Sequence, residues 1–111
     1  MKKLLLAALV GVSYKTFAAP KVVATIKPLH SLVAQVMDGI GEPELLIKQG
    51  SPHGYQMKPA DAKSVAEADV VIYVSHELET FLPPLLQKSE KAHVVEWANL
   101  PNCLLYTSDA A

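Results

Sequence analysis

The chain contains no arginine and only one cysteine, and these shortages exclude several classes of protein. Its ten lysines face eleven acidic residues for a net charge of −1, which argues against the clustered basic surface of a nucleic-acid-binding protein. Cys103 alone cannot form an internal disulfide framework or a multi-cysteine zinc finger. No apolar run reaches the roughly 18 residues of a membrane-spanning helix. The 111 residues, 50% of them hydrophobic, predict one small α/β or all-α domain.

Signatures of common catalytic and nucleotide-binding sites are also missing from the sequence. It has no GxGxxG, GxxxxGK[ST], GxSxG, HExxH or CxxC motif. Ser51 and Ser75 lie close to histidines along the chain, but adjacency in sequence does not create a nucleophile–base geometry. The sequence motifs therefore give no positive indication that the protein is an enzyme.

Residues 1–18 have the organisation of a secretory signal peptide. Lys2 and Lys3 precede the short apolar run Leu4–Val12, and cleavage is expected after the small residue Ala18. No cysteine stands at or just after this point, where a lipoprotein would need one for acylation. The mature protein is therefore expected to be free in a periplasm, without a lipid anchor.

The last nine residues, Cys103–Ala111, resemble the translated mosaic-end adapter of transposon-based sequencing libraries. On this interpretation the natural protein continues beyond Asn102, and Cys103 has no functional meaning. The native mature part is then residues 19–102, which we expect to form one α/β lobe. The alternative is a natural amphipathic tail, and the genomic sequence across Asn102 would decide between the two.

Between these ends, short β-branched runs alternate with amphipathic helical patterns. Strands are expected at Val22–Ile26, Glu44–Ile47, Val70–Val74 and His93–Trp97. Helices are expected after Pro28, after Pro59 and over residues 78–86, where Pro83 and Pro84 must start the helix late or kink it. This alternation predicts βαβ units, and therefore an α/β fold with a four-stranded parallel sheet and flanking helices.

Three histidines follow the carboxyl ends of the first three expected strands. These residues are His30, His53 and His76. Ligands of open α/β sheets bind outside the carboxyl ends of the strands, and imidazole is a good ligand for zinc and other first-row transition metals. Three imidazoles could therefore converge on one edge of the sheet.

Each histidine also has a simpler interpretation. His30 falls in the first turn of a helix, where a structural role is the more common one. His76 precedes acidic residues, and we expect it to pair in solvent with Glu77 or Glu79. His53 lies in a Gly/Pro-rich loop without an obvious packing role, and such loops often carry function. His53 is therefore the main candidate metal ligand, and His30 and His76 are secondary candidates.

Three blocks of the sequence resemble the zinc-uptake ABC-transporter substrate-binding proteins of the Gram-negative periplasm. The blocks are IKPLHSLVAQVMDGIGEPELLI, GSPHGYQMKPADAKSVAEADVVIYV and ELETFLPPLL, and the resemblance extends over residues 21–97. Its most specific part is Gly50–Asp69, which has Pro-His, an aromatic residue, Lys-Pro-x-Asp and Ala-Asp in that order. The resemblance implies the N-terminal lobe of a bilobal, monomeric receptor without enzymatic activity. Such a receptor carries zinc to an inner-membrane ABC permease driven by a cytoplasmic ATPase.

The same resemblance assigns His53 to the family's first metal-ligating histidine and places the remaining ligands beyond Asn102. His30 matches a family histidine that is not a primary ligand, and His76 stands at a variable position. Manganese-type relatives usually carry an acidic residue after Pro-His or in the loop that follows, whereas here no acid stands between His53 and Asp61, which favours zinc.

Three alternatives remain open from the sequence. One is a receptor for manganese rather than zinc. The second, from another class, is a small metal-dependent enzyme whose zinc site is formed by His30, His53 and His76, because catalytic zinc sites use three protein ligands and an open water position. The third is a structural or adhesive domain, whose thermal stability would not depend on metal.

Overall fold

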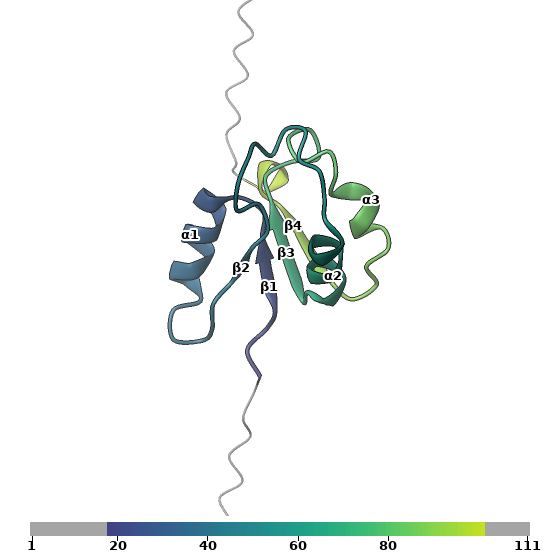
Figure 1. Ribbon diagram of the computed structural model, residues 1–111. Coiled ribbons are helices and arrows are strands. Elements are labelled where there is room, and N and C mark those ends of the chain that lie inside the picture. Colours follow the sequence, from purple (N-terminus) through teal and green to yellow (C-terminus); the bar gives the residue numbers. More distant parts are fainter. Residues whose placement is uncertain (1–17, 102–111) are drawn as a thin grey trace, which may run out of the picture.

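The computed structural model describes residues 18–101 and shows an α/β fold with helices on both sides of a sheet (Figure 1). The expected signal peptide lies outside the described residues except for Ala18, and the tail Cys103–Ala111 lies wholly outside them. Both interpretations of the chain ends therefore stay predictions. Within residues 18–101, no helix has the length and apolar character needed to cross a membrane.

Four parallel strands form one sheet in the order β2-β1-β3-β4. The strands are β1 (Val22–Ala24), β2 (Glu44–Leu45), β3 (Val70–Tyr73) and β4 (His93–Glu96). The predicted four-stranded parallel sheet is thereby confirmed, although each strand is shorter than its apolar run. Backbone pairing continues past β2, because the Ile47 N–H donates to the Thr25 carbonyl over 2.9 Å.

Strand β1 is buried on both faces, which explains why it is a continuous apolar run, whereas β4 at the edge of the sheet is partly exposed. One face of the sheet packs under α2 (Pro59–Glu67) and α3 (Pro83–Leu86), and the other packs under α1 (Lys27–Val36) (Figure 1). The cluster under α2 and α3 contains Val23, Leu46, Val65, Ala68, Val71, Tyr73 and Leu82. The cluster under α1 contains Val22, Ala24, Leu29, Val33 and Met37. Successive residues of β1 thus point to opposite faces, as the pleat requires.

Each α-helix carries a proline in its first turn. Backbone N–H groups in the first turn have no acceptor within the helix, so proline, which lacks this N–H, costs no hydrogen bond there. The third helix is shorter than the apolar spacing over residues 78–86 suggested. Pro83 and Pro84 cannot stand in a helix interior, so α3 begins at Pro83 and residues 76–81 form mainly turns. The late start expected from the two prolines is confirmed, and a 3-10 turn at Trp97–Asn99 follows β4.

Candidate metal-binding edge

The loops that follow the strands lie at one edge of the sheet, called here the carboxyl edge, and they carry two of the three candidate histidines, His53 and His76. His30 is in the first turn of α1, directly after β1. His53 is in the loop of residues 48–58 between β2 and α2, called here the His53 loop. His76 is in the turn after β3.

His53 is exposed at a sharp turn of its loop. Gly50 and Gly54 have φ angles of 90° and 78°, a region that glycine enters at little cost. The backbone N–H of His53 donates to the Ser51 hydroxyl oxygen over 3.2 Å. Within residues 18–101 the imidazole itself takes part in no hydrogen bond. The side chain is thus presented to solvent by a locally shaped backbone.

Tyr55 ties the His53 loop to the rest of the lobe. Its ring lies against Phe81, with the centroids 5.1 Å apart. Its hydroxyl donates to Asp61 Oδ2 over 2.8 Å, and this hydrogen bond raises the pKa of the Tyr55 phenol. The same Asp61 oxygen accepts the Lys58 N–H over 3.0 Å, so one carboxylate holds both the tyrosine and the start of α2. Sequence analysis singled out the motif that contains Tyr55 and Asp61 but not this contact between them.

His30 is half-buried and bonded to the backbone ahead of β2. Its Nε2 lies 2.9 Å from the carbonyl oxygen of Pro43. A carbonyl oxygen only accepts, so Nε2 carries the proton and donates it in this bond. The contact joins α1 to the start of β2 and agrees with the structural interpretation of His30.

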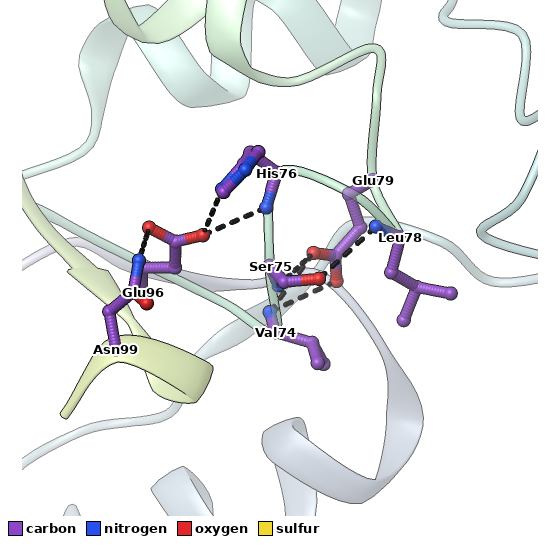
Figure 2. A network of polar contacts seen from close by, with 7 residues as sticks. All are labelled: Val74, Ser75, His76, Leu78, Glu79, Glu96 and Asn99. Carbon is purple, nitrogen blue, oxygen red and sulfur yellow. Dashed lines mark hydrogen bonds and ion pairs between the residues drawn. The ribbon is translucent and has the colours of Figure 1, made fainter. Parts of the chain in front are cut away.

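His76 pairs with Glu96 (Figure 2), and the pairing with Glu77 or Glu79 expected from the sequence is wrong. Glu96 Oε1 lies 2.7 Å from His76 Nδ1 and accepts the His76 backbone N–H over 2.9 Å. Parallel pairing sets Glu96 beside Tyr73, which brings the carboxylate next to the turn after β3. The hydrogen bond to Glu96 raises the pKa of His76, and the His76 backbone N–H lowers the pKa of Glu96.

Glu79 was not singled out as a functional residue in the sequence, yet it is the one fully buried carboxylate among the described residues. Its oxygens accept the Thr25 hydroxyl over 2.7 Å, the Val74 N–H over 3.0 and 3.2 Å, and the Ser75 N–H over 3.1 Å. Figure 2 shows the carboxylate turned toward the end of β3. Its neighbours Leu78 and Thr80, with Glu77 close by, gave no sequence signal that this acid is buried.

The three histidines do not assemble into a metal centre within the described part of the chain. In residues 18–101, no group of three or more histidine, cysteine, aspartate or glutamate side chains is arranged to hold a metal ion. A structural zinc site needs four ligands and a catalytic one needs three. The described residues therefore do not support the alternative enzyme site built from His30, His53 and His76.

Comparison with known proteins gives a consistent family assignment. Residues 22–109 match the family model described as "ZnuA: Zinc-uptake complex component A periplasmic". The high-affinity zinc uptake system protein ZnuA of Brucella abortus (strain 2308) is 45% identical over 76 residues, which cover 67% of this chain and 23% of the relative. Its counterpart in Haemophilus influenzae is 32% identical over 104 residues, covering 90% of this chain and 31% of the relative.

A solved structure agrees with these relatives. The crystal structure of the Zn(II)-bound ZnuA-like domain of Streptococcus pneumoniae AdcA superposes with a TM-score of 0.68 at 26% identity, over 80% of this chain and 34% of that one. The chain thus spans about a quarter to a third of the length of the curated relatives it matches. The family model covers most of the chain, and the fold agrees with that of a ZnuA-like domain, so the chain belongs to the ZnuA family of periplasmic zinc-uptake components.

Proposed function

We propose that this chain is the N-terminal lobe of a periplasmic receptor that captures zinc and delivers it to an inner-membrane ABC permease and its ATPase. The supporting relatives are named high-affinity zinc uptake proteins, and a similar solved domain is zinc-bound. The observation that carries the proposal is the exposed His53 on a tethered loop at the carboxyl edge. The receptor performs no covalent chemistry.

In this proposal His53 supplies one imidazole to zinc, and the rest of the full-length protein supplies the other ligands. Zinc coordinates neutral imidazole, so a proton competes with the metal for the ring. Zinc affinity should therefore fall as the solution is acidified. Closure of a second lobe over the carboxyl edge would complete the coordination shell and exclude water.

The choice of zinc over manganese rests on the donors near His53. The His53 loop contains no carboxylate, and manganese sites favour oxygen ligands more strongly than zinc sites do. A competition titration of the full-length protein with both metals tests this choice. Tighter binding of manganese than of zinc would overturn it.

Export and assembly are part of the same proposal. The signal peptide of residues 1–18 would be cleaved in the periplasm, and the mature receptor would be a monomer without a lipid anchor. N-terminal sequencing of the secreted protein and its elution volume on size exclusion test these two statements. The foreign origin of Cys103–Ala111 stays a prediction that the genomic sequence across Asn102 decides.

Isothermal titration with zinc tests the role of His53. In the full-length protein, His53→Ala should sharply weaken zinc binding, whereas His76→Ala should change it little because His76 is engaged with Glu96. The 111-residue chain alone should bind zinc weakly, since a single imidazole neither excludes water nor fixes a geometry. Tight one-to-one binding by the short chain, abolished equally by alanine at His30, His53 and His76, would refute the proposal and favour the three-histidine enzyme.

A further inference from the structure

The buried carboxylate of Glu79 has no part in zinc capture as described so far, although its burial is costly. A carboxylate removed from water is tolerated only when it is fully hydrogen-bonded or paired with a cation. Within residues 18–101 Glu79 forms no salt bridge, and all of its hydrogen-bond donors are neutral. Such a complete set of donors indicates that the carboxylate holds a particular backbone arrangement.

The first element that Glu79 holds is Thr25, directly after β1. Besides the hydroxyl that donates to Glu79, Thr25 donates its N–H to the Ile72 carbonyl over 3.2 Å. Its own carbonyl accepts the Ile47 N–H over 2.9 Å. The His53 loop starts at the residue after Ile47. Glu79 is therefore joined, through one residue, to the point where this loop leaves the sheet.

The second element is the turn that carries Phe81. The Glu79 N–H donates to the Ser75 carbonyl over 3.0 Å, and the Glu79 carbonyl accepts the Leu82 N–H, also over 3.0 Å. Phe81 lies inside this hydrogen-bonded segment and contacts the ring of Tyr55. Tyr55 is two residues after His53. The carboxylate adds to these backbone bonds by accepting the Val74 and Ser75 N–H groups where the segment begins. It thus supports both the start of the His53 loop, through Thr25, and the turn that carries Phe81.

We propose that Glu79 is a positioning residue for zinc capture, which it serves by pre-ordering the His53 loop through Thr25 and through Phe81 and Tyr55. This inference rests on the proposed role of His53. A ligand that is already ordered loses less conformational entropy when the metal binds, so loosening its loop weakens binding without removing a ligand. Glu79 lies outside the coordination shell and acts only through the backbone and rings that it holds.

The inference makes a specific distinction between glutamine and leucine at this position. In Glu79→Gln, the amide oxygen can take the place of Oε2 and accept the Val74 and Ser75 N–H groups. The amide nitrogen then faces the Thr25 hydroxyl, which can turn and accept. Glu79→Leu keeps a side chain of similar size and leaves these donors without an acceptor. Glu77→Leu is the matched control, because Glu77 is exposed two residues away.

The test measures zinc affinity by isothermal titration and amide hydrogen exchange of the apo form in the full-length protein. Glu79→Leu should weaken zinc binding about tenfold, the lower end of what loss of a supporting contact costs a metal site. It should also speed exchange in residues 48–58. Glu79→Gln should stay within about threefold of the wild type, as one altered neutral hydrogen bond suggests. Glu77→Leu should change neither quantity.

Milder variants keep the test decisive if Glu79→Leu does not fold. Thr25→Val and Phe81→Leu each remove one of the two connections, and each should speed exchange in the His53 loop and weaken zinc about threefold. His53→Ala separates the two ideas, because it should abolish tight zinc binding and leave loop exchange unchanged. If His53→Ala leaves zinc affinity intact, the proposed function is wrong. If His53→Ala weakens binding while the Glu79, Thr25 and Phe81 variants leave affinity and loop exchange unchanged, only the positioning role is wrong.

Discussion

Truncation of Leu82 to alanine should destabilise the folded lobe by about 3 kcal/mol. The Leu82 side chain is fully buried (0% exposed) in the cluster beneath α2 and α3, where it packs with residues of β1 and β3. Replacing a buried leucine by alanine costs about 2–5 kcal/mol, because transfer free energy is lost and the surroundings only partly fill the cavity. Leu82 precedes α3 rather than standing inside it, so a change in helix propensity adds little.

Leu32→Ala is the matched control, since the same atoms are removed from a side chain that is 47% exposed on α1. It should cost less than about 1 kcal/mol, because most of that surface stays in water in either variant. In a lobe of this size, 1 kcal/mol shifts the Tm by about 4–8 °C, so Leu82→Ala should lower it by roughly 12–24 °C. Circular dichroism during heating and urea titration measures both variants. Equal losses of stability for the two would refute the difference in burial between Leu82 and Leu32.

Three further outcomes are expected. NMR titration should show the pKa of His76 above its ordinary value, and Glu96→Gln should return it toward that value. Because the pKa of His76 is higher in the folded than in the unfolded protein, its contribution to stability is complete below the unfolded pKa. That contribution is lost as the pH rises through the folded pKa. Gly54→Ala should lower the free energy of unfolding in urea by about 1 kcal/mol, because the φ angle of 78° is unfavourable for alanine. A new Cβ would meet no atom within 4 Å, so the cost comes from the backbone conformation alone, and an unchanged stability would contradict this conformation. Ultraviolet titration should find Tyr55 ionising above its ordinary pKa, and Asp61→Asn should reduce that shift; an unaltered titration would argue against the bond between them.

The strand–helix alternation could be predicted because local sequence determines it. Val22, Val23 and Ala24 are all buried, since both faces of β1 are covered, and a parallel strand of this kind leaves an uninterrupted apolar run. The placement of His53 and His76 in loops followed from the same logic, because the loop after each parallel strand lies at the carboxyl edge, whereas His30 lies in α1 and its ring contacts Pro43 ahead of β2. Pro83 and Pro84 likewise set a limit on the third helix that needed no tertiary information.

The partners of the polar side chains could not be predicted, because they depend on which strands become neighbours. His76 has two acids close in sequence, yet it pairs with Glu96, twenty positions away, through the register of β3 and β4. Glu79 looked like a solvated acid beside Glu77, but it turns inward to reach Thr25 across the sheet, 54 positions away. Local sequence does not indicate which residues so far apart along the chain will meet, whereas the sheet order β2-β1-β3-β4 brings both pairs together.

The hydrogen bonds of the three histidines support the proposal that His53, rather than His30 or His76, binds the metal. His30 donates a hydrogen bond from Nε2 to the Pro43 carbonyl, which fixes the orientation of its ring. His76 is drawn toward its protonated form by Glu96, and a proton on the ring competes with a metal ion for the same lone pair. The imidazole of His53 has no such bond within residues 18–101, and its backbone is already shaped by two glycines and by the contacts of Tyr55. The ring of His53 can therefore turn toward a metal without opposing any bond of its own, and its loop needs little reordering, whereas the rings of His30 and His76 are held in orientations set by Pro43 and Glu96.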